Sequence, residues 1–276
     1  MDIMNKFAYV TVLFGESIYL AGALVLGYTL KRTHTPNPII ILVTPDISEK
    51  SRHQLKKFYT QIIEIPYIIP SKTIFSSEAN ERFMNVFTKL QVLSLSSYSK
   101  ILLLDLDMIV CKNIDHLFLL TPPAACLKHF YVPYGKPIPP NMICKNNKLI
   151  NTINAGLMLL KPDPSELEKI KTSIIASDQI NQFKYPEQDY LSLRYCDKWT
   201  SITFNYNYQF GLTSRVKKSH YKFDQIYVIH YSSSYKPWNL LLADYIVTPD
   251  EDKFINMHKK YYDLWLDIYE KLNIIR

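Results

Sequence analysis

Strand-like and helix-like segments alternate along the first half of the chain, and this alternation restricts the fold more than any other feature. Short runs of branched apolar residues are separated by longer segments with apolar residues at helical spacing. A strand–helix–strand order predicts parallel strands with helices packed on the sheet. We expect strands at 7–13, 39–43, 62–65 and 100–104, and helices at 19–32, 48–59 (with Ser48 as N-cap) and 83–97.

The second half of the chain is less regular. A Pro-rich, polar stretch at 121–147 indicates a long excursion, and further strands are expected at 157–160, 201–204 and 225–230, with a helix at 164–177. The tail, 254–272, predicts an amphipathic helix that packs on the domain, with partner docking as the alternative. Since no repeat or linker interrupts the pattern, we expect one domain over 1–276, an α/β fold with a Rossmann-like sheet flanked by helices.

Composition argues against several other classes of protein. The net charge of +7 is spread along the chain without a five-residue basic run, so we expect no nucleic-acid partner. The most apolar stretch, 18–30, has about 13 residues where a bilayer needs ~20, which predicts a core helix and no membrane span. The four cysteines form no C-x-x-C pair and no secretory signal is recognisable, so reduced thiols in the cytoplasm are expected.

Asp105 and Asp107 directly follow the continuous apolar run 100–104, which is typical of a central strand buried on both faces. Ligands of open α/β sheets bind at the carboxyl ends of such strands. In an extended chain, residues i and i+2 point to the same side, so both carboxylates could reach one ion. About one Asp-x-Asp pair is expected by chance, and Asp250 and Asp252 form a second one. That pair lies in a polar, Pro-led stretch and is interpreted as a helix N-terminus.

His230 closes the strand-like run 225–230 and is the third candidate ligand. One imidazole with two carboxylates is a mostly oxygen donor set, which suits Mn²⁺ or Mg²⁺ better than zinc. A lone histidine is otherwise a common structural residue, and that alternative stays open.

Several further blocks occur in an order that resembles glycosyltransferase family 8, and the chain is also similar to the glycogenin-like proteins of insect viruses. The resemblance runs from about Ala8 to Trp238. It rests on Tyr9-Val10-Thr11, 22–27 (GALVLG), 42–45 (LVTP), Thr88-Lys89-Leu90, 104–107 (LDLD), 113–118 (NIDHLF), Asn154-Ala155-Gly156, Glu187-Gln188-Asp189 and 230–238 (HYSSSYKPW).

The resemblance implies a GT-A fold, a UDP-sugar donor and a metal site. By matched position, Asp105, Asp107 and His230 would bind Mn²⁺, with Mg²⁺ as the alternative, and Lys236 would add positive charge at the donor phosphates. The ion would stabilise the charge that develops on the leaving diphosphate.

The same resemblance assigns residues to the nucleotide, the donor sugar and the reacting carbon. Uridine would lie near Val12, Phe14, Tyr19 and the backbone of Leu106; the sugar near Arg82, Lys89, Asn154, Ala155 and Gly156; the anomeric carbon beside Glu187, Gln188 and Asp189. The alternatives are that Val12 and Phe14 are core residues, that 187–189 cap a helix starting near Tyr190, and that Lys236 is a surface lysine.

Two departures from the family pattern bear on the donor sugar. Ser233 stands where glycogenin has glycine, and Gly15-Glu16 with one extra residue replaces the usual Asn-Asp. Glycogenin's acceptor tyrosine has no secure match, because Tyr206 and Tyr208 lie in the right region without the motif.

The resemblance thus implies a retaining hexosyltransferase that uses UDP-glucose or UDP-galactose. We expect a front-face route, because Gln188 is a poor nucleophile. The acceptor, whether sugar, polyol or protein, is not readable, and a homodimer is left open. The alternatives are a silent nucleotide-sugar-binding protein of the same fold and a basic nucleic-acid-binding protein.

Overall fold

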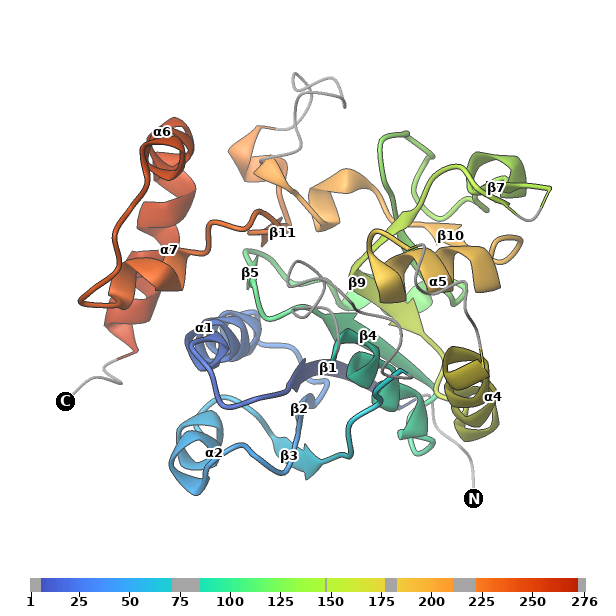
Figure 1. Ribbon diagram of the computed structural model, residues 1–276, viewed down its shortest axis with the longest axis horizontal. Helices are drawn as coiled ribbons and strands as arrows, with labels where there is room; N and C mark the ends of the chain where they lie inside the picture. The colour runs from blue at the N-terminus through green and yellow to red at the C-terminus, as the bar shows by residue number, and fades with distance from the viewer. Residues whose placement is uncertain (1–5, 71–84, 147, 177–182, 211–221, 273–276) are drawn as a thin grey trace.

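A seven-stranded mixed sheet forms the centre of the protein in the computed structural model, which describes residues 6–70, 85–146, 148–176, 183–210 and 222–272 (Figure 1). The strand order is β10-β6-β9-β4-β1-β2-β3. β9 runs antiparallel to its neighbours β4 and β6, and the other neighbouring pairs are parallel. The strands are β1 (Phe7–Leu13), β2 (Ile39–Val43), β3 (Gln61–Glu64), β4 (Lys100–Leu104), β6 (Ala124–Leu127), β9 (Ile153–Leu160) and β10 (Thr200–Ser201).

The sheet is buried on both faces, as the apolar runs of the sequence require. Along β1, Tyr9 and Leu13 pack in one hydrophobic cluster, whereas Ala8, Val10 and Val12 pack in the other. This alternation follows from the twofold period of a strand. The central strands β1 and β4 therefore hold their carboxyl ends in fixed positions between two packed layers.

Helices cover the two faces of the sheet, with α1 and α2 on one side and α4 on the other (Figure 1). The α-helices are α1 (Tyr19–Arg32), α2 (Glu49–Leu55), α4 (Pro164–Ala176), α5 (Pro186–Arg194), α6 (Pro249–Met257) and α7 (Lys259–Lys271). The short 3₁₀ helices are η2 (Val86–Ser94), η3 (Asp115–Leu119), η4 (Pro140–Met142), η6 (Phe204–Tyr206), η9 (Phe223–Gln225) and η10 (Pro237–Leu241). Ser48 caps α2 by accepting a hydrogen bond from the N–H of Ser51, as predicted.

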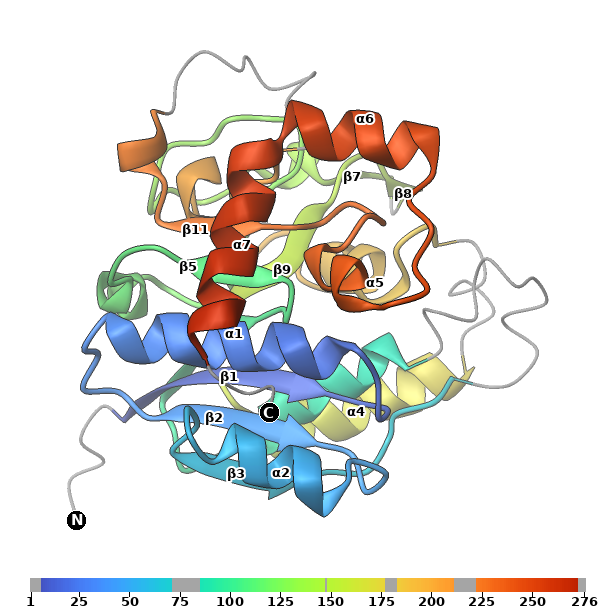
Figure 2. The same ribbon diagram turned by 90° about the vertical axis from the view of Figure 1, so that its left-hand side faces the viewer.

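Two small antiparallel pairs complete the strands. β5 (Met108–Val110) pairs with β11 (Val228–His230), and β7 (Cys144–Lys145) pairs with β8 (Lys148–Leu149). Helix α7 crosses over α1 and β5 (Figure 2) and buries Tyr261, Tyr262, Trp265 and Ile268 in the hydrophobic core. The C-terminal segment thus closes the side of the molecule on which β5 and β11 meet.

Several segments differ from the sequence-based expectation. The helix expected at 48–59 ends at Leu55, the strand expected at 225–230 begins at Val228, and the one expected at 201–204 is β10 followed by η6. The region 83–97 contains the 3₁₀ helix η2 where an α-helix was expected, and residues 83–84 lie outside the described part of the chain. The excursion 121–147 contains the strand β6. It was not predicted, because two prolines precede it directly and proline indicates a loop. The tail is two helices that meet at His258, and Met257 at the end of α6 is exposed.

The prediction of reduced thiols is wrong for two of the four cysteines. Cys144 and Cys196 form a disulfide across 52 residues of sequence, while Cys111 and Cys126 are free. Spacing could not reveal this pair, because the fold brings β7 and the end of α5 together. The disulfide removes one of the two reasons for the cytoplasmic prediction, the expectation of reduced thiols.

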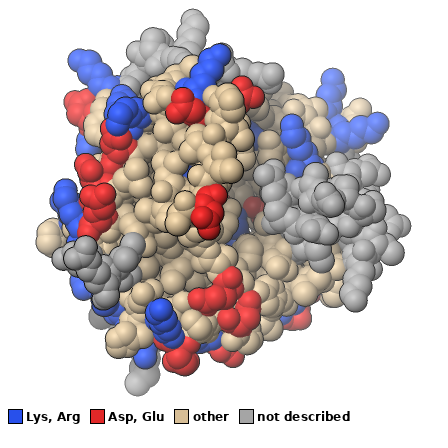
Figure 3. Space-filling model, turned by 60° about the vertical axis from the view of Figure 1, so that its left-hand side comes forward, with Lys and Arg blue, Asp and Glu red and all other residues tan. Residues whose placement is uncertain are grey.

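Among the described residues, no helix is long and apolar enough to cross a bilayer. On the face shown in Figure 3, Lys and Arg side chains lie apart from one another, with acidic residues between them.

Candidate active site

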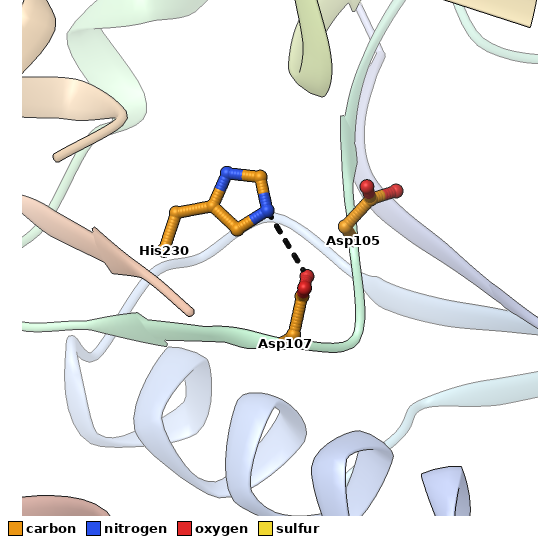
Figure 4. Close-up of side chains that lie close together, drawn as sticks. All are labelled: Asp105, Asp107 and His230. Atoms are coloured by element: carbon orange, nitrogen blue, oxygen red, sulfur yellow. Dashed lines mark ion pairs between the residues drawn. The ribbon is translucent and has the colours of Figure 1, made fainter. Parts of the chain in front are cut away.

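The two aspartates lie at a sharp bend between β4 and β5. Leu106 and Asp107 form a turn, and the N–H of Asp105 donates to the carbonyl of Gly156 on β9. The extended geometry assumed from the sequence is therefore wrong in detail. The carboxylates come together because the chain turns a corner between them (Figure 4).

Helix α1 packs tightly against this bend. A Cβ added to Gly22 would lie only 2.7 Å from the carbonyl oxygen of Leu106 and 2.7 Å from Cζ3 of Trp238. Real Cβ atoms do not approach other atoms so closely, so glycine is needed for α1 to support the turn. Leu106 itself is buried in the core and presents its backbone to α1.

Pairing of β11 with β5 brings His230 to the aspartates from a distant part of the sequence. His230 is opposite Met108 in the ladder, and the N–H of Tyr231 donates to the carbonyl of Asp107. His230 Nε2 lies 3.2 Å from Asp107 Oδ1 (Figure 4). His230 and Asp107 are almost completely buried.

The donor atoms of Asp105, Asp107 and His230 all lie within 4.8 Å of one another, as predicted. Two carboxylate oxygens and one imidazole nitrogen fit a hard divalent cation such as Mn²⁺ or Mg²⁺. The three residues could therefore hold one metal ion.

Two lysines balance the carboxylates. Lys89 Nζ lies 2.7 Å from Asp105 and 3.2 Å from Glu187, and Lys236 Nζ contacts Asp107 at 2.5 Å and the carbonyl of Tyr231 at 2.6 Å. Burial opposes the charge of Asp107, but the ammonium of Lys236 holds its pKa well below the ordinary value. Burial and the neighbouring Asp107 raise the pKa of Asp105 despite Lys89.

Strand β9 and the first turn of α5 line the next part of the site. Gln188 accepts from the N–H of Ala155 at 3.3 Å and donates to Thr152, so its amide is engaged in holding β9. Asp189 accepts from the N–H of Tyr185 and so caps α5, which begins at Pro186, before the expected start. The capping alternative is thus correct for Asp189, while Glu187 pairs with Lys89.

The residues assigned to the nucleotide have different surroundings. Val12 belongs to the core of β1 and Phe14 packs against the same core, which is the alternative stated for both. Tyr19 begins α1, is 41% exposed, and its ring lies 4.9 Å from that of Trp238. Ser233 donates to the carbonyl of Tyr235 inside the loop before Lys236, and Arg82 lies outside the described residues.

Two of the three amide side chains near His230, Asn207 and Gln209, were not predicted from the sequence. Asn207 Oδ1 lies 2.8 Å from His230 Nδ1, and Gln209 and Asn154 complete a buried amide cluster with Asn207. Asn207 and Gln209 alternate along the chain with Tyr206 and Tyr208, which were considered as acceptor tyrosines. No spacing rule marks an asparagine as a partner of a histidine 23 residues away.

Comparison with known proteins agrees with this geometry. The model of the family described as "Glycosyl transferase family 8" matches residues 10–241, a span that includes every residue of the candidate site. The chain belongs to glycosyltransferase family 8. It is 62% identical over 269 residues to the uncharacterized protein R707 of Acanthamoeba polyphaga mimivirus, covering 98% of this chain and 95% of that protein. It is 26% identical to galactinol synthase 1 of Solanum lycopersicum, covering 94% and 82%.

Solved structures place the family 8 chain in the GT-A fold that the resemblance implied. The galactosyltransferase LgtC, solved with donor and acceptor sugar analogues, superposes with a TM-score of 0.60 at 15% identity over 98% of this chain and 97% of LgtC. The glycosyltransferase GlyE of Streptococcus pneumoniae gives 0.59 at 20% identity over 97% of this chain and 63% of GlyE. At these identities the likeness concerns the fold alone.

Proposed function

We propose that this family 8 protein is a retaining hexosyltransferase that moves glucose or galactose from UDP to an acceptor, with Mn²⁺ or Mg²⁺ bound by Asp105, Asp107 and His230. The convergence of these three donor groups within 4.8 Å, next to the ammonium of Lys236, carries the proposal. The bound ion would supply Lewis-acid stabilisation of the diphosphate that leaves the sugar.

The chain's own residues have distinct roles in this scheme. Lys236, which contacts Asp107, lies where it can pass to the diphosphate and stabilise the charge that grows there. Lys89 is held by Asp105 and Glu187 and so presents a fixed cation at the donor sugar. Tyr19 offers a half-exposed ring beside Trp238 for the nucleotide.

The contacts of Gln188 favour a front-face route over a covalent intermediate. Its amide already bonds to the backbone of Ala155 and to Thr152, and an amide is a weak nucleophile. Retention would follow if the acceptor hydroxyl attacks on the side from which UDP departs, giving up its proton to the leaving phosphate. Asn154 and Gly156 lie on β9, on either side of the Ala155 that Gln188 contacts, and they would then border the sugar.

A catalytically silent UDP-sugar-binding protein of the same fold is the second candidate. The test is mass spectrometry of the purified protein incubated with Mn²⁺, UDP-glucose or UDP-galactose, and a panel of sugars, polyols and proteins. Release of UDP with a matching acceptor mass gain supports the transferase. Saturable UDP-sugar binding without UDP release would identify the silent binder, and neither binding nor release would reject both.

A further inference from the structure

His230 Nδ1 faces a ring of three buried amide side chains formed by Asn154, Asn207 and Gln209. Asn207 Oδ1 is 2.8 Å from His230 Nδ1, and Asn207 Nδ2 is 2.7 Å from Asn154 Oδ1. Asn154 Nδ2 donates to Gln209 Oε1 at 3.3 Å, and Gln209 Nε2 lies 3.5 Å from Asn207 Oδ1. All four side chains are at least nine-tenths buried, so water does not compete for these bonds.

A backbone group fixes which way each amide points. The N–H of Gly156 donates to Asn154 Oδ1 at 3.0 Å, and because a backbone N–H only donates, the atom it faces must be oxygen. The Asn207 atom that meets this oxygen must then be nitrogen. The remaining Asn207 atom, which faces His230, is therefore oxygen and only accepts.

This orientation determines the tautomer of His230. A neutral imidazole has one N–H and one lone pair, and an accepting oxygen at Nδ1 requires the N–H there. The lone pair is then on Nε2, which points to Asp107 Oδ1 at 3.2 Å. The lone pair of His230 Nε2 and the carboxylate of Asp107 are both electron-pair donors, so a cation between them would be bound by both.

We propose that Asn207 is a positioning residue that holds the proton on His230 Nδ1 and so keeps Nε2 available as a metal ligand. Partners of this kind on the outer nitrogen of a ligating histidine strengthen metal binding about 10- to 100-fold. Gly156 supports the arrangement in a second way, because a Cβ there would lie 2.4 Å from Cε1 of His230. The segment carrying Asn207 is fixed to β11 by the bond from the N–H of His230 to the carbonyl of Tyr208.

The test reads the tautomer directly and separately from catalysis. ¹⁵N-histidine NMR of the metal-free protein at alkaline pH, with His230→Gln to assign the signal, should show the proton on Nδ1. Asn207→Leu, which removes the accepting oxygen at similar volume, should give a mixed or reversed tautomer and a Mn²⁺ affinity, measured by EPR, lower by about 10- to 100-fold. Asn207→Asp keeps an accepting oxygen and should keep the proton on Nδ1.

Asn205→Leu is the matched control, because Asn205 lies two residues away and bonds to Thr203 and Gln225, outside the amide ring. It should change neither the tautomer nor the Mn²⁺ affinity. A wild-type signal with the proton on Nε2 would overturn the proposal, and that reading does not depend on any variant folding. So would a folded Asn207→Leu protein with the wild-type tautomer and affinity. The inference rests on the metal site of the proposed function, but a correct tautomer without sugar transfer would reject only the transferase.

Discussion

At the scale of single residues, each candidate metal ligand has a partner beside it: Lys89 for Asp105, Lys236 for Asp107 and Asn207 for His230. Asp105 and Asp107 were predictable because they follow a buried strand, where ligands of α/β sheets bind. His230 was assigned by the resemblance to family 8, and it reaches the aspartates through the separate β5–β11 pair. Asn207 and Gln209 were not predictable, because amides are common in loops and their role depends on a contact that only the fold creates.

Removing the Lys236 ammonium should have opposite effects on metal binding and on donor binding. The ammonium contacts the Asp107 carboxylate, to which the metal ion would also bind, so the two cations repel each other. Lys236→Ala should therefore raise Mn²⁺ affinity in the absence of nucleotide. The same change should weaken UDP-sugar binding and lower kcat, with a combined loss of roughly 2–4 kcal/mol in kcat/KM. Lys236→Arg should restore little, because a planar fork does not replace a compact charge.

Titration calorimetry with Mn²⁺, with and without UDP, and steady-state kinetics measure these effects. Lys259→Ala is the control, since Lys259 forms an exposed ion pair with Asp263 on α7. If Lys236→Ala alters none of these quantities, Lys236 acts neither on the metal nor on the donor and only bonds to Asp107 and Tyr231.

At the scale of secondary-structure elements, the periodicity of the sequence predicted β1, α1, β2 and β4 with the bounds that the structure has. Those elements bury their apolar residues by regular spacing, so the pattern is visible in the sequence. β6 and the break at His258 were missed, because a four-residue strand after two prolines and a one-residue interruption of a helix leave no periodic signal.

Gly22 and Gly27 of α1 both make close packing contacts, but only Gly22 lies next to the bend that carries the metal ligands. Gly22→Ala would place its Cβ against the carbonyl of Leu106, whereas Gly27→Ala would meet Cε2 of Tyr59 at 2.7 Å, away from the metal ligands. Overpacking of this kind costs about 1–3 kcal/mol, partly offset by the better helix propensity of alanine. Both variants should lower the melting temperature in thermal denaturation. Only Gly22→Ala should also weaken Mn²⁺ binding, and equal effects on Mn²⁺ binding would contradict the role given to Gly22.

The carboxylate of Asp115, in η3, forms hydrogen bonds to β1 and to the loop before β2. These bonds should make the stability of the protein depend on pH. The carboxylate accepts hydrogen bonds from Tyr9, Thr35, Asn37 and Asn113. Burial opposes the charge, but these bonds together lower the pKa of Asp115. The stabilisation is therefore complete above the unfolded-state pKa of about 4 and is lost as pH falls through the lower folded-state value.

Asp115→Ala should accordingly reduce the free energy of unfolding by roughly 2–3 kcal/mol at neutral pH. The difference from wild type should shrink below about pH 4. Urea unfolding across this pH range measures it, with the exposed Asp263→Ala as the control. A difference that stays constant down to low pH would show that the charge of Asp115 does not contribute.

At the scale of the whole molecule, the disulfide between Cys144 and Cys196 joins β7 to the end of α5. Alkylation under denaturing, non-reducing conditions should modify Cys111 and Cys126 only, and reduction should expose all four thiols to the reagent. In the chain-entropy model, closing a loop of this length stabilises the fold by about 4 kcal/mol. Cys196→Ser should therefore lower the melting temperature, whereas Cys111→Ser should not. Four reactive thiols before reduction would contradict the pairing.

The central claim is that a metal ion held by Asp105, Asp107 and His230 makes this family 8 chain a transferase. The most direct measurement is UDP release from UDP-glucose and UDP-galactose, with Mn²⁺ and with chelator, for wild type, Asp107→Asn and Asp252→Asn. Asp252 belongs to the other Asp-x-Asp pair, in the first turn of α6, and lacks the histidine. The account predicts Mn²⁺-dependent release by wild type and by Asp252→Asn, and none by Asp107→Asn although its fold is intact. Release that persists in chelator, or in Asp107→Asn, would contradict it.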